Sequence, residues 1–277
     1  MDSVKTKDKI VRVVIHVILI IMSIIMLVPF LWMVLTAFKT VSESTSVNPF
    51  VIFPSSWKFD NFVTVWKNYN FLILYKNTLL MIFFRVLCAV LTATMAGYAF
   101  GRLRFPGKNF LFALVLVQMM VPPQIFLLPQ YLMMSKIHML NTEFALVFPG
   151  LVTAFGTFLL KTSYQGLPRD LEEAASIDGA SGWVKMKNIV MPLMMSSVTI
   201  CLFLTLSRAF MVYDLNLSLT AGAPYGTTEM AAMHVYEKAF TSRQFGVGQA
   251  EALILFIIVA CISGIQVYLT KKQEVEA

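Results

Sequence analysis

The sequence has 277 residues, of which 58% are hydrophobic and only 13% are charged, and its mean hydropathy is +0.74. A soluble domain of this size would lack the polar side chains needed to cover its core, so we expect an all-α integral membrane protein in contact with lipid. The net charge of +7 requires no nucleic-acid partner, because most of the excess cations mark one face of the membrane.

Six apolar segments recur along the chain, each long enough to cross a hydrocarbon core of ~30 Å. We predict transmembrane helices at about 10–36, 77–100, 109–134, 143–162, 190–213 and 246–270. Residues 10–270 then form one transmembrane domain, with short tails at 1–9 and 271–277. The first segment lacks a signal-peptide cleavage site and is expected to be a retained span.

Two of these segments contain residues that alter helix geometry. GYAFG at 97–101 is a G-x-x-x-G pattern, whose missing side chains let another helix approach closely, so we expect helix packing there. MVPPQIFLLP at 120–129 places three prolines in the third segment, which removes backbone donors and predicts a kink or a break. Such breaks often line cavities, and both a structural role and a pathway role fit this one.

The distribution of Lys and Arg predicts the orientation. An even number of spans places both termini on one side, and 13 of the 22 cations lie at the two termini and in the 101–109 and 161–189 loops. The positive-inside rule makes this face cytoplasmic. The loops at about 37–76 and 214–245 lie on the opposite face, where their Pro, Gly, Asn and aromatic residues favour turns or short surface helices.

A polar segment at 167–192 interrupts the apolar pattern on the predicted cytoplasmic face. Pro168 suits the first position of a helix, and acidic side chains follow it where the helix dipole favours negative charge. They are Asp170, Glu172 and Glu173. Ala174 and Ala175 leave one helix face nearly flat, and Asp178-Gly179 predicts a turn in which Gly179 takes a positive φ.

A second short helix is expected from about Ser181 to Ile189, and Pro192 then begins the fifth span. The residues alone fit two interpretations of this loop. It is either an amphipathic hairpin on the membrane surface, or a protruding helix pair whose flat surface and charged rim are gripped by another protein.

The spacing in this loop resembles a known signature. Glu173-Ala174-Ala175, three residues, Gly179, nine residues, and then Ile189, Met191 and Pro192 are similar to the EAA loop of permease subunits in binding-protein-dependent ATP-binding-cassette (ABC) importers, with Met in place of one Leu. The stretches AGYAFGRLRFPGK, LPQYLMMSKIHMLNT and AASIDGASGWVKMKNIVMP extend the resemblance over nearly the whole chain. They are similar to the carbohydrate branch of that superfamily, of the maltose and multiple-sugar type.

This resemblance implies a type I ABC importer fold and a multi-pass protein of a bacterial inner or plasma membrane, with both termini cytoplasmic. The implied partners are a second homologous permease, two copies of a cytoplasmic ABC ATPase, an extracellular solute-binding protein or lipoprotein, and a sugar substrate. It also implies that the loop is a coupling helix docked on the ATPase. The coupling residues would be Glu173, Ala174, Ala175, Asp178, Gly179 and Pro192.

The sequence contains no motif for catalysis. GRLRFPGKN at 101–109 has five residues between its glycines where a phosphate-binding loop needs four, and Asn109 stands where Ser or Thr should bind magnesium. The three Cys and three His residues show no metal-ligand spacing. We therefore expect a non-enzymatic subunit without catalytic residues, a metal site or a cofactor of its own, with ATP and magnesium bound by the partner ATPase.

Ionisable residues within the spans are the candidates for a translocation path, because burying one in hydrocarbon costs at least ~2.5–3.5 kcal/mol. Arg85 and Arg208 are the two clearest. Arg208 precedes a polar and aromatic cluster suited to a hydroxyl-rich ligand, formed by Tyr213, Asp214 and Asn216. Arg208 also fits an interfacial residue that snorkels outward or bridges to the partner permease. Glu251 is expected at the membrane interface.

Other functions predict different residues. A permease for a peptide or a phosphonate would share the same loop. An ion-driven secondary transporter would carry acidic residues near the membrane midplane, and the six segments contain almost none. A membrane-embedded enzyme would need a catalytic constellation that the sequence does not show.

The predicted orientation can be tested by cysteine labelling in intact cells. A cysteine introduced as Lys58→Cys should react with a membrane-impermeant maleimide, because the 37–76 loop is predicted outside. The variant Lys185→Cys should react only after the membrane is permeabilised. The reverse pattern would overturn the assignment of the two faces.

Overall fold

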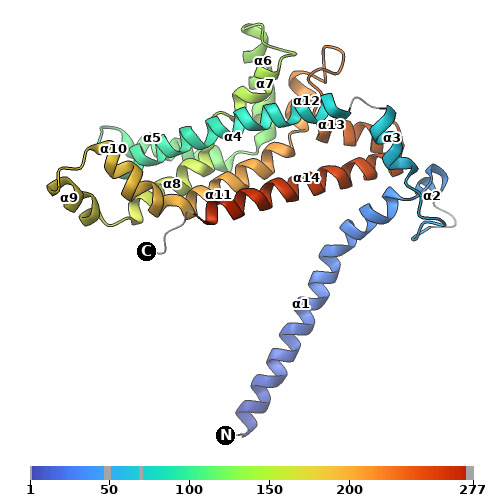
Figure 1. The fold of residues 1–277 in the computed structure, drawn as a ribbon, viewed down its shortest axis with the longest axis horizontal. Coiled ribbons are helices and arrows are strands. Elements are labelled where there is room, and N and C mark those ends of the chain that lie inside the picture. Colours follow the sequence, from blue (N-terminus) through green and yellow to red (C-terminus); the bar gives the residue numbers. More distant parts are fainter. Residues whose placement is uncertain (1, 47–50, 69–70, 273–277) are drawn as a thin grey trace. The chain divides into compact units, whose positions relative to one another are not determined.

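The computed structural model describes residues 2–46, 51–68 and 71–272, with side chains from residue 9 onward except that of residue 68. The described residues form helices and connecting loops without strands, so the expected all-α fold is confirmed (Figure 1). Residue 1 and residues 273–277 of the predicted tails lie outside the described part. Five helical segments are long and apolar enough to cross a membrane, or six if one bent pair forms a single span.

The chain divides into two compact units, Met1–Tyr69 with Val235–Ile254 and Asn70–His234 with Leu255–Ala277. The first unit contains α1 (Asp2–Ala37), α2 (Val41–Thr45), α3 (Asp60–Asn68), the π-helical segment η4 (Glu237–Thr241) and the start of α14 (Phe245–Lys271). The apolar side chains of α1 are exposed along the span that begins at Lys9. Side chains of this kind suit an apolar surrounding of ~30 Å thickness.

The loop that follows α1 is tied to its last turn. The Asn61 amide donates hydrogen bonds of 2.8 Å to the carbonyl oxygens of Ala37 and Lys39, which the helix itself leaves without partners. The Lys39 ammonium donates to the Val51 carbonyl oxygen at 2.8 Å and lies 4.0 Å from the centre of the Trp32 ring. The described residues of the predicted outer loop thus include the short helices α2 and α3, which is one of the two structures that its composition indicated.

Glu251 lies in the same unit, and its side chain is fully buried. Its expected position at the membrane interface stays a prediction, and the structure adds that protein atoms surround its side chain. Glu251 lies about one and a half turns into the apolar helix α14, and no local pattern in the sequence predicts that other segments cover its carboxyl group.

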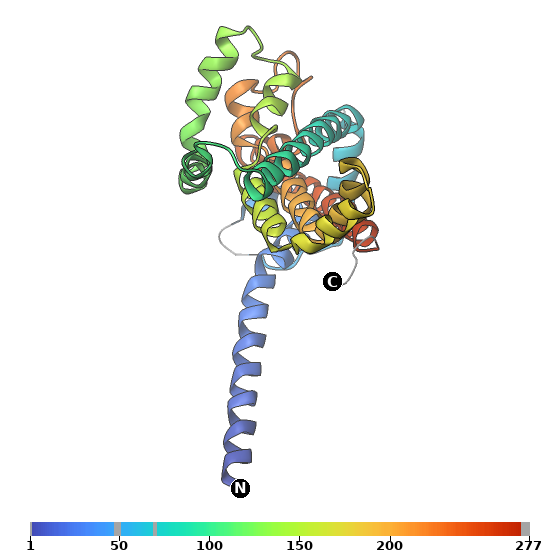
Figure 2. The same cartoon turned by 90° about the vertical axis from the view of Figure 1, so that its left-hand side faces the viewer.

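The second unit is built on α4 (Phe71–Arg102), α8 (Ala154–Gly166) and α11 (Met191–Phe210), which pack against one another. Figure 2 views these helices from another side. One buried cluster lies around Met81, Met134, Leu146 and Phe210, and residues of α14 from Leu255 onward pack against it. A second cluster lies around Leu160, Tyr164 and Met194.

The contact between α4 and α8 depends on glycine. A Cβ atom on Gly97 would lie 2.9 Å from Leu160 Cβ, and one on Gly101 would lie 2.8 Å from Tyr164 Cβ. On the facing helix, a Cβ on Gly156 would lie 2.9 Å from Cys201 Sγ. The packing role predicted for GYAFG is confirmed, because both of its glycines permit this close approach.

The third apolar segment is not one straight helix. It consists of α5 (Lys108–Met120), the 3-10 helix η1 (Pro123–Phe126) and α6 (Leu127–Lys136), with a bend of 106° at the break (Figures 1 and 2). The predicted break is confirmed. Pro122 and Pro123 supply no backbone N–H at that point, so the helical hydrogen bonds cannot continue.

The fourth segment, predicted as a span at 143–162, is a candidate span over Glu143–Gly166, and its helix is interrupted. It consists of α7 (Glu143–Val147), the 3-10 helix η2 (Phe148–Gly150) and α8, with the N-cap of α8 at Thr153. The Thr92 hydroxyl donates to the Leu151 carbonyl oxygen at 2.7 Å and so satisfies one backbone group of the break.

The fifth span begins earlier than predicted. After α9 (Arg169–Ile177), the chain forms α10 (Gly182–Lys185), the π-helical segment η3 (Met186–Val190) and α11 without a break. Pro192 lies in the first turn of α11, and the wider turn of η3 precedes it. The expected second short helix is therefore continuous with the span, because a π-helical turn accommodates the donor that proline lacks.

The glycine contact generates a stability prediction. Gly97→Ala should lower the free energy of unfolding by about 1–3 kcal/mol through overpacking against α8. Gly264→Ala is the matched control, because Gly264 also lies in an apolar helix but has open space where its Cβ would be. The measurement is thermal unfolding in detergent, and equal midpoints for the two variants would contradict the proposed contact.

Candidate functional site

The 167–192 loop is anchored to the end of α4. An Arg102 guanidinium nitrogen lies 3.1 Å from a carboxylate oxygen of Glu172 and donates to the Leu167 carbonyl oxygen at 2.9 Å. The Arg102 side chain is only 7% exposed, so this ion pair is better shielded from water than an ordinary surface pair. It fixes the first turn of α9 relative to the glycine-packed helix.

The turn at Gly179 has the geometry that its sequence predicted. Gly179 has a φ of +80°, its N–H donates to the Ser176 carbonyl oxygen at 3.1 Å, and the Ala180 N–H donates to the Ala175 carbonyl oxygen at 2.9 Å. These two bonds form a Schellman motif, which satisfies the last carbonyl groups of α9. A residue with a Cβ atom is strained at this φ, which explains the glycine.

Further hydrogen bonds hold α9 against α10. The Lys185 ammonium donates to the Ser176 hydroxyl at 2.9 Å, and that hydroxyl donates to the Glu172 carbonyl oxygen at 2.6 Å. The Ser181 hydroxyl accepts the Val184 N–H at 3.4 Å as the N-cap of α10. The loop is therefore a defined helix pair, as its capping residues indicated.

The surface of this helix pair is open. Glu173, Ala174 and Gly179 are exposed, and the apolar side chains of Ile177 and Trp183 are 87% and 75% exposed. Leu171 and Val184 are exposed as well. An apolar patch rimmed by charges, on a helix pair held by hydrogen bonds and an ion pair, has the character of a protein-docking surface.

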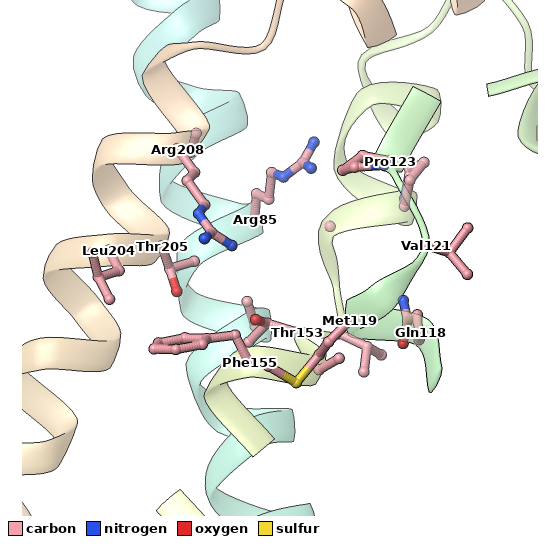
Figure 3. A pocket seen from close by; sticks show the side chains of 16 residues that line it. Arg85, Gln118, Met119, Val121, Pro123, Thr153, Phe155, Leu204, Thr205 and Arg208 are labelled. Carbon is pink, nitrogen blue, oxygen red and sulfur yellow. The ribbon is translucent and has the colours of Figure 1, made fainter. Parts of the chain in front are cut away.

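The second region of interest is a cavity of about 520 Å³ among α4, α5, η2, α8 and α11 (Figure 3). This volume is within the usual range of small-molecule sites, ~300–1,000 Å³. Arg85 and Arg208 both line it, so two residues far apart in sequence meet at one site. Its other labelled lining residues are Gln118, Met119, Val121, Pro123, Thr153, Phe155, Leu204 and Thr205.

Arg85 is held in place by the break in the fourth span. Its guanidinium donates to the Leu146 carbonyl oxygen at 2.9 Å, at the end of α7. Gly150 lies so close that an added Cβ atom would overlap the guanidinium. The sequence showed no partner for Arg85, because this partner is a backbone group exposed only when the helix is interrupted.

Arg208 is the freer of the two arginines. Its guanidinium carbon lies 5.8 Å from the centre of the Phe155 ring, within the range of a cation–π contact, and the residue is exposed. Figure 3 shows its side chain extending along the cavity above Phe155 and beside Thr205. Arg208 therefore faces the cavity in this chain.

A smaller cavity of about 290 Å³ adjoins the first and shares Arg85, Gln118 and Pro123 with it. Tyr213 and Asp214 line it, in agreement with the cluster predicted after the fifth span. A carboxylate oxygen of Asp214, at the start of α12 (Asp214–Leu219), accepts a hydrogen bond of 3.4 Å from the Gln124 amide of η1. The break at Pro122 and Pro123 thus brings η1 to this site.

Asn216 does not belong to the cluster, which corrects its place among the candidate path residues. It is fully buried and lines neither cavity. Its amide donates to the Thr220 hydroxyl at 2.7 Å and to the Thr228 carbonyl oxygen at 2.8 Å, and accepts the Met230 N–H at 3.0 Å. Asn216 therefore closes the loop between α12 and α13 (Ala231–Tyr236).

Sequence reasoning missed several residues at both regions. The sequence shows Arg102 and Glu172 as two charged residues and does not predict the ion pair between them. Gln118, Thr153 and Phe155 line the cavity next to helix breaks, and two signals could have indicated them: a lone amide before Pro122, and the Pro149-Gly150 pair within a span. Within the described residues, no group of three or more His, Cys, Asp or Glu could hold a metal ion.

Comparison with known proteins defines the class of this fold and site. The family described as binding-protein-dependent transport system inner membrane component matches residues 89–275, which is more than half of the chain. The chain belongs to this family. The matched region includes the 167–192 loop and Arg208, and it begins four residues after Arg85.

Similar proteins include three curated permeases. The probable starch degradation products transport system permease protein AmyD of Thermoanaerobacterium thermosulfurigenes is 52% identical over 112 residues, 40% of this chain and 38% of that protein. The diacetylchitobiose uptake system permease protein NgcG of Streptomyces coelicolor is 28% identical over 71% of this chain and 66% of that protein. The arabinooligosaccharides transport system permease protein AraQ of Halalkalibacterium halodurans is 32% identical over 60% of each. The matches thus span 38% to 66% of these relatives.

Two solved structures share the fold. A chain of a bacterial ABC transporter involved in the import of the acidic polysaccharide alginate matches with a TM-score of 0.77 and 18% identity, over 94% of this chain and 96% of that chain. A chain of a bacterial alginate ABC transporter, in complex with an alginate pentasaccharide-bound periplasmic protein, matches with a TM-score of 0.72 and 14% identity, over 96% of each. At this identity, the likeness shows the expected ABC importer permease fold alone.

The corrected role of Asn216 can be tested against its neighbour. Asn216→Leu should lower the thermal unfolding midpoint in detergent, because it leaves the buried Met230 N–H without its acceptor, at a cost of about 1–3 kcal/mol. Asp214→Leu, at an exposed position, should leave the midpoint nearly unchanged. A larger loss of stability in Asp214→Leu would contradict this division of roles.

Proposed function

We propose that this chain is one permease half of an ABC importer for a sugar or oligosaccharide, and that it couples transport to a cytoplasmic ATPase through the 167–192 loop. The observation that carries the proposal is the construction of this loop. Its Schellman turn at Gly179, its exposed Glu173 and Ala174, and its anchor to Arg102 make a rigid, open surface. A hairpin lying on the membrane requires neither the glycine turn nor the ion pair.

The complex would contain a second homologous permease, two copies of the ATPase and an extracellular solute-binding protein or lipoprotein. ATP and magnesium would be bound by the ATPase, and this chain would contribute no catalytic step. The location would be a bacterial cell membrane, with both termini and the loop in the cytoplasm.

A saccharide substrate is supported by the names of the relatives, which refer to starch degradation products, diacetylchitobiose and arabinooligosaccharides. The cavity supports it chemically. Gln118, Thr153 and Thr205 offer hydrogen-bonding groups, and Phe155 offers a ring face on which a sugar can stack. The alternative is a peptide or phosphonate substrate. Uptake of a labelled saccharide by the complex would exclude this alternative.

The coupling role is tested by changing the turn. Gly179→Leu should abolish sugar uptake and reduce association with the ATPase, because the new side chain strains the turn by about 1–2 kcal/mol and fills the docking surface. Glu173→Lys should have the same effect through its reversed charge. The measurements are pull-down of the ATPase by the permease in detergent and uptake in cells.

Gly107→Leu is the matched control. Gly107 also has a left-handed backbone, with a φ of +75°, and open space around its Cβ position, but it lies in the loop before α5. This variant should keep ATPase association. Normal association and normal uptake in Gly179→Leu would show that the loop is a surface hairpin.

A further inference from the structure

The cavity shared by Arg85 and Arg208 has an unusual charge balance. None of its 16 lining residues, all of which the structure describes, is Asp or Glu. The polar groups that accompany the two guanidinium groups are the Gln118 amide and the Thr153 and Thr205 hydroxyls, which are neutral. The cavity wall therefore carries two positive charges from this chain.

Neither charge is balanced by a carboxylate in the part of the chain that the structure describes. Among the residues described, no carboxylate forms an ion pair with Arg85 or Arg208. Arg85 donates to a backbone carbonyl oxygen, and Arg208 lies over the Phe155 ring. Both contacts orient a guanidinium without neutralising it. Asp214 lines the adjoining cavity only, where it accepts a hydrogen bond from Gln124.

The backbone adds to the positive electrostatic potential of the cavity. Thr153, Ala154 and Phe155, in the N-terminal turn of the 13-residue α8, line the cavity beside the arginines. The N-terminus of a helix carries a partial positive charge, and interrupted membrane helices use it at anionic groups of substrates. The arginine pair supplies the main charge, and the helix terminus has the same sign.

We propose that this cavity binds the carboxylate of an acidic saccharide, so that the transported oligosaccharide contains uronic acid units. This inference rests on the proposed function of the chain as a sugar permease. Arg85, held by the Leu146 carbonyl oxygen and packed against Gly150, provides one charge, and the exposed Arg208 provides the guanidinium that pairs with the carboxylate. Phe155 stacks on the sugar ring, and Gln118 and Thr205 bind its hydroxyl groups.

The experiment uses the complete complex of this chain with its partner permease and ATPases, in detergent and without the solute-binding protein. Binding is measured for three acidic trisaccharides, built from galacturonate, glucuronate or mannuronate, and for their neutral methyl esters. At least one acid should bind about tenfold or more tightly than its ester, because a hydrogen bond to a charged group is lost in the ester. High salt should weaken only the binding of the acid.

Two variants assign the effect to the cavity. Arg208→Gln should reduce binding of the acid to that of its ester. Lys161→Gln removes a cation that lies 3.8 Å from the Phe112 ring, outside the cavity lining, and should leave the preference unchanged. The stability of Arg208→Gln is verified by the thermal unfolding midpoint of the complex.

The outcomes are distinct. Binding of no acid, equal binding of acid and ester, or an unchanged preference in Arg208→Gln would overturn the proposal. A phospholipid that co-purifies with the complex and is lost in Arg208→Gln would also overturn it, because the arginines would then hold a lipid phosphate. The proposed function as a saccharide permease fails on a different result: the complex with its solute-binding protein imports no saccharide, acidic or neutral, in an ATP-dependent assay.

Discussion

Helix α4 approaches α8 closely because Gly97 and Gly101 have no side chains, and both functional regions are positioned by this contact. Arg85 lies on α4 beside the break that precedes α8, and Arg102 lies at the other end of the same helix, where it holds Glu172 of α9. The two arginines are 17 residues apart, which corresponds to about 25 Å along the helix. A change in the packing of α4 would therefore disturb the cavity and the 167–192 loop together.

The cavity depends on helix breaks, which are permitted inside a membrane only where their backbone groups find partners or face water. The break in the third span and the break in the fourth both border the same space, and the residues next to each break line it. Arg85 and Thr92 satisfy carbonyl groups that the fourth span leaves open. The charged residue that is costly to bury thus stabilises the irregular backbone that forms the site.

Much of the fold and most of the 167–192 loop followed from local patterns in the sequence. Apolar length, the prolines at 122 and 123, the GYAFG glycines and the Gly179 turn each act within a few residues, so they can be read from the chain directly. The cavity could be predicted only in part. The meeting of Arg85 with Arg208, the break at Phe148–Gly150 and the burial of Asn216 and Glu251 depend on segments that are distant in sequence. Asn216 shows the difficulty. Its position beside two candidate residues indicates a ligand-binding amide, whereas its side chain forms the hydrogen bonds that hold the loop between α12 and α13.

The uninterrupted course from α10 through η3 to α11 has a mechanical consequence. One continuous helical segment joins Trp183, on the exposed surface of the loop, to Arg208 at the cavity. It spans 26 residues, or about 40 Å along the helix axis. Its only irregular turn is the π-helical segment, where a helix is most easily bent or rotated. A displacement of the loop would therefore move Arg208 through a helix that can bend at one turn. Arg85 would move with α4, which has no such turn.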